Sequence, residues 1–246
     1  MDVQNPTWDP APVSEPFSDG SSILYCALVI YASYLMTRMF TAPNPDPPHA
    51  LEPDRLASPK CVVFLHLYQY LLGAVGVLHG LFGLLPRCHK QALCPSASWN
   101  SGRFVWSTSS SILLFACLLA AHLRLLAYRQ LGKDFTFRLS RPSGLVRSGL
   151  YAYMQHPSYT GAIVTVACFT QLLVRSDGIL GCWMGNYPWN LVMGGVIYAN
   201  SAFLVGALLI TLPARILKEE TLLRECFGAE WDEYHRQTAR LIPWVY

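Results

Sequence analysis

Five apolar stretches, separated by polar segments, dominate the hydropathy pattern of this chain. They cover about residues 22–40, 61–85, 104–127, 157–174 and 191–212. A helix rises about 1.5 Å per residue, so stretches of this length approach the roughly 30 Å hydrocarbon core of a bilayer. The pattern predicts about five transmembrane helices, of which the fourth is short and either spans at a tilt or bends back.

The polar segments divide the chain into three regions. Residues 1–20 are rich in proline and acids and contain no Lys or Arg. They indicate a mobile tail rather than a cleavable signal peptide, which needs a basic start. Residues 21–128 hold the first three helices, and residues 129–246 hold the last two with a polar C-terminal segment. After Pro213, apolar and charged residues alternate, which is typical of an amphipathic helix lying at the membrane surface.

Composition supports a membrane protein. The 246 residues are 52% hydrophobic and only 13% charged, whereas soluble domains carry about 25% charged residues. The net charge of +3 comes without a long basic run, which argues against a nucleic-acid-binding protein. We therefore expect an all-α polytopic membrane protein with about five transmembrane helices and a cytosolic amphipathic C-terminal helix.

The eight cysteines do not indicate a metal or redox centre. Several lie within apolar stretches, where cysteine behaves as a small hydrophobic residue. None forms a CxxC or Cys/His ligand pattern, so no bound metal is expected. Cys88 and Cys94 could form a disulfide if they lie on the lumenal side.

Basic residues are concentrated in alternate connecting segments. The first loop, the segment 124–147 and the C-terminal part hold 14 of the 18 Lys and Arg residues. With five helices these three regions share one side, and basic residues favour the cytosolic side. Segments 132–156 and 213–240 are therefore both expected to face the cytosol.

Small residues recur in two of the apolar stretches. Four glycines between Gly73 and Gly83 are spaced by three and four residues, and the fifth stretch holds Gly195 and Gly206. Such faces let helices approach closely in lipid. Both stretches are therefore expected to present a small face to a neighbour.

Two polar features carry candidate chemistry. Proline disfavours helix for the residue before it and suits a first helical turn, so residues 144–156 form a constrained loop and Pro157 begins a helix. That helix start offers N–H groups and a positive dipole end to an anionic or hydroxyl-rich ligand. Further along, Arg215 and Glu219 share one helix face, with Glu220 beside them.

Three blocks in this order resemble the isoprenylcysteine carboxyl methyltransferase family of integral membrane enzymes. They are LVRSGLYAYMQHPSYTG, ARILKEETLL and FGAEWDEYHRQTARLIPWV. The family pattern runs LVxxGxYxxxRHPxYxG, then RxxxEE, then a closing FGxxYxxY…P segment. The likeness covers roughly the last 120 residues, so residues 129–246 are expected to form a methyltransferase catalytic region.

The resemblance implies S-adenosylmethionine as the methyl donor, in a pocket facing the cytosol from the endoplasmic reticulum membrane. It implies that Glu219 meets the charged end of this cofactor and that Arg215 is the catalytic, substrate-binding residue, holding an acceptor carboxylate. Such an acceptor needs positioning rather than a general base. The other residues implied to line the cofactor are Leu145, Val146, Tyr151, His156, Pro157, Ser158 and Tyr159.

Two positions depart from the family pattern. Ser143 stands where the family usually has His, and Gln155 stands where it usually has Arg. The first change loses a cofactor contact, and the second removes a charge near the pocket. Both allow an acceptor other than a prenylated protein, such as a small lipophilic acid.

Several functions remain open beside methylation of a C-terminal prenylcysteine. Amine methylation of a phospholipid headgroup would need a base, and no further acid or His is obvious in the three blocks. An NADPH-linked sterol-type reductase is disfavoured by Arg215, Glu219 and Glu220. A non-catalytic lipid-binding protein with a decayed site fits Ser143 and Gln155, but the retained Arg215 and Glu219 argue against it. The acceptor, the oligomeric state and the membrane of residence are left open.

Overall fold

The computed structural model describes residues 20–45, 59–94, 101–183 and 188–243. Within these ranges the regular secondary structure is helical, apart from one isolated bridge between Met154 and Ala239, and loops connect the helices. The main helices are α1 (Gly20–Arg38), α2 (Pro59–Leu84), α4 (Thr108–Leu131), α5 (Pro157–Leu173) and α6 (Trp189–Phe227). Two shorter helices are α3 (Arg87–Leu93) and α7 (Ala229–Gln237). The predicted mobile tail lies, but for Gly20, outside the described residues.

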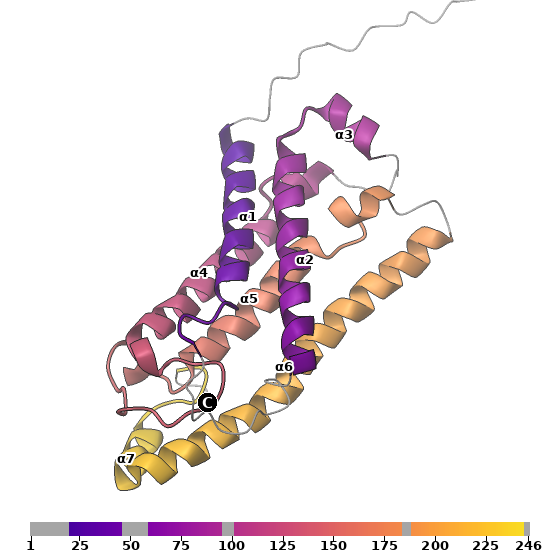
Figure 1. Ribbon diagram of the computed structural model, residues 1–246. Helices are drawn as coiled ribbons and strands as arrows, with labels where there is room; N and C mark the ends of the chain where they lie inside the picture. Colours follow the sequence, from indigo (N-terminus) through magenta and orange to yellow (C-terminus); the bar gives the residue numbers. More distant parts are fainter. Residues whose placement is uncertain (1–19, 46–58, 95–100, 184–187, 244–246) are drawn as a thin grey trace, which may run out of the picture.

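Helices occupy all five predicted apolar stretches. Among the described residues, α1, α2, α4 and α6 are long and apolar enough to cross a membrane. Helix α5 has 17 residues, about 26 Å of helix, and packs chiefly on α4. The predicted all-α, polytopic architecture is confirmed (Figure 1).

The glycine stripe of α2 packs against α1, as predicted. A Cβ atom placed on Gly76 would lie 2.2 Å from the Ser33 hydroxyl, and one on Gly80 would lie 2.6 Å from Ile30. The small face of the fifth stretch, which also includes Gly194, is used only in part. A Cβ on Gly194 in α6 would lie 3.6 Å from Ser176, an ordinary contact, whereas one on Gly195 or Gly206 would meet nothing within 4 Å.

Helix α4 begins four residues later than the apolar pattern suggests. Ser107 is its N-cap and forms a capping box with Ser110, in which each side chain bonds the other residue's backbone N–H. This box satisfies N–H groups that a helix start leaves unpaired. Phe104, predicted to open the helix, instead closes the 3-10 turn η1 (Ser101–Phe104).

Helix α6 continues without a break through Pro213 to Phe227. The amphipathic helix expected after Pro213 is therefore the last part of a single 39-residue helix, and a separate short amphipathic helix, α7, follows it. Proline removes one backbone hydrogen bond, a loss that membrane helices tolerate. Arg215 and Glu219 therefore lie on the same continuous helix as the last span.

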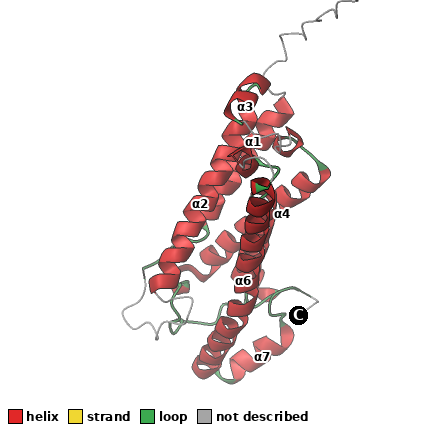
Figure 2. Cartoon of the chain, turned by 90° about the vertical axis from the view of Figure 1, so that its right-hand side faces the viewer, coloured by secondary structure: helices red, strands yellow, loops and turns green. Residues whose placement is uncertain are grey.

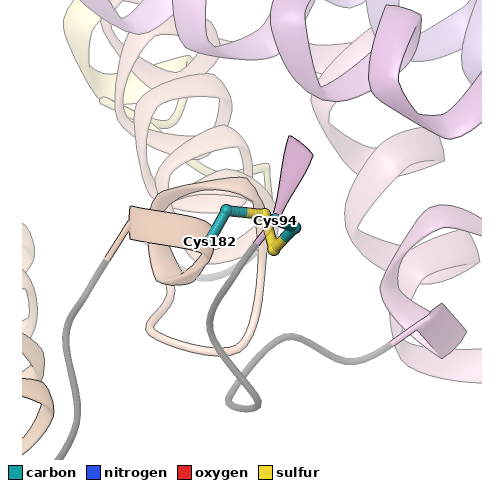
Figure 3. The surroundings of a disulfide bond; sticks show 2 residues. All are labelled: Cys94 and Cys182. Atoms are coloured by element: carbon teal, nitrogen blue, oxygen red, sulfur yellow. A yellow bond between two sulfur atoms is a disulfide. The ribbon is translucent and has the colours of Figure 1, made fainter. Parts of the chain in front are cut away.

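The cysteine pairing differs from the one suggested by the sequence. Cys94, at the end of α3, forms a disulfide with Cys182 in the 3-10 turn η4 (Ile179–Trp183) (Figure 3). The two residues are 88 positions apart, so the chain folds back to bring them together. Cys88 is not the partner.

An ion-pair cluster lies in the same part of the fold. Asp177 accepts hydrogen bonds from Arg103 at 2.8 Å and from Arg175 at 2.9 Å. Burial alone would raise the pKa of the Asp177 carboxyl, but these two guanidinium groups outweigh it and lower that pKa. Helix α3 lies at one end of the molecule, and α7 lies at the other, as Figures 1 and 2 show.

Candidate functional site

The His156-Pro157 junction is built as the sequence predicts. Pro157 is the first residue of α5, and His156 precedes it with a non-helical backbone. Upstream, Gly149 opens the 3-10 turn η3 (Gly149–Ala152) with a φ of +63°, a conformation that favours glycine. The side chain of Gln130 packs against Gly149 and accepts a hydrogen bond from the N–H of Leu150 at 3.0 Å.

Helix α5 is fixed against α4 by a close contact beside this junction. A Cβ on Gly161 would lie 2.7 Å from the Ala120 carbonyl oxygen and 2.8 Å from the Cβ of Arg124. The approach lets the buried Arg124 donate to the Ser158 carbonyl at 2.8 Å and to its hydroxyl at 2.9 Å. Arg124 also donates to the carbonyl of Met39, which directly follows α1, so it links α4 to the end of α1 and to the start of α5.

Arg215, Tyr159 and Glu219 form a connected line between α5 and α6. The Arg215 Nε donates to the Tyr159 hydroxyl at 2.9 Å, and this hydroxyl donates to Glu219 Oε2 at 2.6 Å. Arg215 Nη2 also donates to the Phe137 carbonyl in the preceding loop. One tyrosine thus orients the guanidinium and the carboxylate that the sequence placed on one helix face.

His156 lies between the two neighbouring carboxylates of α6. Its Nδ1 is 3.8 Å from Glu219 Oε1, and its Nε2 is 3.4 Å from Glu220 Oε1. The His156 side chain is only 2% exposed and that of Glu220 only 9%. Burial of a charge is costly unless it is paired. His156, Glu219 and Glu220 therefore form a paired polar cluster inside the fold.

The C-terminal segment completes the cluster from a third direction. The Arg240 guanidinium lies across the Glu220 carboxylate, with Nε 3.0 Å from Oε1 and Nη2 3.1 Å from Oε2. Two bonds of this kind form the forked geometry that fixes a carboxylate most firmly.

The structure brings together four of the sequence-predicted site residues: His156, Tyr159, Arg215 and Glu219. Pro157 shapes the junction, whereas the Ser158 hydroxyl is bonded to Arg124. Leu145 and Val146 are half-buried in the loop before η3.

Tyr151, also predicted to line the cofactor, lies in η3 and contacts α7. Its carbonyl accepts a hydrogen bond from the Tyr234 hydroxyl at 2.7 Å, and its side chain is buried. Burial, followed by the charge of Glu219, raises the pKa of the Tyr151 phenol. The phenol therefore stays protonated and lies within electrostatic reach of the cluster.

The two departures from the family pattern have specific partners in this chain. Ser143 bonds Asp134 through both its backbone N–H, at 3.0 Å, and its hydroxyl, at 2.7 Å. Gln155 donates to the Thr238 carbonyl at 2.7 Å and to its hydroxyl at 3.0 Å, and its Oε1 lies 2.9 Å from His235 Nδ1. Gln155 thus joins the loop to the C-terminal segment.

Sequence reasoning did not single out Arg124 or Arg240. The signal for Arg124 was a basic residue within a predicted span, where such residues are rare and commonly functional. The signal for Arg240 was its place in the closing FGxxYxxY…P block. In both cases the partner is remote in the chain, so spacing gave no indication of the contact.

Comparison with known proteins places this geometry in context. Residues 112–225 match the model of the isoprenylcysteine carboxyl methyltransferase (ICMT) family. A protein-S-isoprenylcysteine O-methyltransferase of Schizosaccharomyces pombe is 29% identical over 147 residues, which cover 58% of this chain and 52% of that protein. The match thus spans about half the length of this relative.

A solved structure of the eukaryotic intramembrane Ras methyltransferase ICMT, determined without a monobody, aligns with 92% of this chain and 94% of its own. The identity is 16% and the TM-score is 0.45. The resemblance seen in the sequence is confirmed by the family match, which includes the first two of the three blocks: residues 112–225 of this chain match the isoprenylcysteine carboxyl methyltransferase family.

Proposed function

We propose that this protein transfers a methyl group from S-adenosylmethionine to the carboxylate of a lipophilic acceptor, with a C-terminal prenylcysteine as the favoured substrate. The family match and the name of the yeast relative support a carboxyl methyltransferase. The observation that carries the proposal is the line from Arg215 through Tyr159 to Glu219.

The residues around His156 suit the charges of the proposed donor. S-adenosylmethionine carries an ammonium and a sulfonium group, and such cations favour carboxylates and aromatic faces. Glu219 would hold the ammonium group, and the rings of His156 and Tyr159, stacked 5.5 Å apart, offer aromatic surface. When bound, the cofactor supplies an activated methyl group.

Arg215 would bind and orient the acceptor carboxylate. A guanidinium presents its donors in a planar fork that matches a carboxylate, and the Tyr159 hydroxyl fixes the direction of this fork by accepting from Nε. Nη2 donates to the Phe137 carbonyl, and the acceptor carboxylate would replace this carbonyl as its hydrogen-bond partner. No proton has to be removed, because the acceptor is already an anion.

A second candidate, methylation of an amine on a phospholipid headgroup, is favoured by one observation. His156 lies between two carboxylates, a setting in which an imidazole could accept the proton that an amine must lose. In this reaction the methyl acceptor is not a carboxylate, so Arg215 has no acceptor carboxylate to hold. The role of Arg215 therefore separates the two candidates.

The deciding experiment replaces Arg215 with Lys, which keeps the charge and loses the fork. Carboxyl methylation should fall by at least about 100-fold, as expected when a positioning contact is lost, while cofactor binding stays nearly intact. The assay uses labelled S-adenosylmethionine with a farnesylated cysteine analogue, phosphatidylethanolamine and small lipophilic acids as acceptors.

Arg224→Lys is the matched control, since Arg224 lies on the same helix and pairs with Asp232 at the surface. Its activity should equal that of the parent chain. Near-normal carboxyl methylation by Arg215→Lys would overturn the carboxylate assignment. Labelling of phosphatidylethanolamine alone would favour the amine reaction instead.

We also propose that the site faces the cytosol from the endoplasmic reticulum membrane. Disulfides persist in oxidising compartments, so the Cys94–Cys182 bond supports a lumenal position for the region around α3. The candidate site lies at the other end, where most basic residues are found. Both observations favour the same orientation.

A further inference from the structure

Residues 238–241 run beside the loop that carries His156. The N–H of Gln155 donates to the Ala239 carbonyl at 2.8 Å, and the N–H of His156 donates to the Arg240 carbonyl at 2.9 Å. The Thr160 hydroxyl donates to the Leu241 carbonyl at 2.7 Å. We refer to residues 238–241 as the strap.

The strap satisfies backbone groups that the loop cannot pair by itself. Residues 155 and 156 precede a helix that begins at a proline, so their N–H groups have no place in the helical hydrogen-bond ladder. Both residues are buried, and a buried N–H without a partner is costly. The position of the His156 backbone therefore depends on a segment about 80 residues further along the chain.

Arg240 extends this dependence to the side chains. Its guanidinium binds both oxygens of the Glu220 carboxylate. The same carboxylate also lies 3.4 Å from His156 Nε2. Without the guanidinium, a carboxylate that is only 9% exposed would keep a weaker set of partners and would be free to rotate. His156 would then lose the neighbour that fixes the orientation of its ring.

Gln155 holds the strap through its side-chain amide. Its amide donates to the carbonyl and the hydroxyl of Thr238, and the Thr238 hydroxyl donates to the Tyr234 carbonyl at 2.7 Å. Where the family pattern has Arg, the neutral amide thus joins the strap to α7.

We propose that the strap positions His156 and Glu220 for the methyl donor and that Arg240 is its positioning residue. The proposal rests on the proposed function for the identity of the donor. The order of the loop itself does not depend on that assignment. These two parts are therefore tested by different measurements.

The test compares the full-length chain with Arg240→Gln, Arg240→Lys and the control Arg236→Gln. Arg236 is exposed and pairs with Glu233 on α7, so its loss removes a nearby positive charge without touching the strap. Hydrogen exchange of the amides of Gln155 and His156 reports the order of the loop. Calorimetry with S-adenosylhomocysteine and a KM–kcat analysis report donor binding and transfer.

In Arg240→Gln, exchange at these two amides should be faster and donor affinity weaker, each by about 3- to 10-fold for a partly exposed ion pair. The KM of the acceptor should not change. Arg240→Lys should give exchange rates and donor affinities between those of Arg240→Gln and the parent chain. If Arg240→Gln does not fold, Arg240→Lys replaces it in the test. Arg236→Gln should match the parent.

Unchanged exchange at residues 155 and 156 in the Arg240 variants would overturn the proposal. So would faster exchange spread equally over α1 and α4, because Arg240 would then be a residue of general stability. A parent chain that neither binds the donor analogue nor transfers methyl groups would refute the proposed function. The exchange data would still decide whether the strap orders the loop.

Discussion

At the residue scale, the Glu219 carboxylate is held in place by its neighbours. It accepts a short hydrogen bond from Tyr159 and lies 3.8 Å from His156. Glu219→Gln keeps the shape of the side chain and removes its charge. We predict that affinity for S-adenosylmethionine falls by about 10- to 150-fold, because a charge-assisted contact becomes a neutral one.

Calorimetry measures this loss directly. Glu225→Gln is the control, since Glu225 lies on the same helix and is exposed. Its affinity should equal that of the parent chain. An unchanged affinity in Glu219→Gln would remove Glu219 from the cofactor site.

Local spacing predicted those site residues that share one element. Arg215 and Glu219 are one turn apart on α6, and His156 and Tyr159 flank the start of α5. Predicting that these residues meet across two helices required the family resemblance, because spacing along the chain does not show which helices pack together. The role of Arg240 was not predicted for the same reason. It contacts Glu220, which lies 20 residues earlier in the chain and on a different element.

At the scale of elements, the packing of α2 on α1 depends on the absence of side chains at its glycines. A Cβ on Gly76 would lie 2.2 Å from the Ser33 hydroxyl and 2.8 Å from the Phe169 ring. Gly76→Leu should therefore force α1, α2 and α5 apart. We expect destabilisation of about 1–3 kcal/mol, the usual range for overpacking.

A lower midpoint of thermal unfolding in detergent measures this effect. Gly195→Leu is the matched control, because a Cβ at Gly195 in α6 meets nothing within 4 Å. Its midpoint should be unchanged or slightly raised, since glycine is a poor helix former. Equal midpoints for both variants would contradict the packing role of Gly76.

Hydropathy predicted the existence of the helices better than their ends. The start of α4 depends on the capping box of Ser107 and Ser110. These polar residues lie within a few positions of Phe104, where the apolar stretch begins, so hydropathy alone placed the start too early. The length of α6 was underestimated because Pro213 was taken as a boundary. A proline costs one hydrogen bond, whereas the packing and charge contacts on both sides of it keep the helix continuous.

For the whole molecule, the convergence of distant segments was predictable and the cysteine pairing was not. The distribution of basic residues placed segments 132–156 and 213–240 on one side, and the contact between Arg147 and Glu230 at 2.6 Å joins them. A disulfide partner 88 residues away leaves no signature in spacing, because several pairings of the same cysteines are possible.

The orientation of the molecule in its membrane gives the last prediction. Arg141 and Gln237 are exposed near the candidate site, and Val105 is exposed before α4, close to the disulfide end. Each is changed to Cys in a chain carrying Cys226→Ser, which removes an exposed native thiol. A membrane-impermeant thiol reagent is then applied to sealed microsomes whose cytosolic face is outward.

Positions 141 and 237 should be labelled in intact microsomes, because basic residues and the methyl donor favour the cytosolic side. Position 105 should be labelled only after permeabilisation, since the neighbouring Cys94–Cys182 bond requires an oxidising lumen. Labelling of 141 and 237 from opposite sides would contradict the shared site. Labelling of position 105 together with them, before permeabilisation, would leave the shared site intact and contradict the orientation, because a disulfide would then face a reducing cytosol.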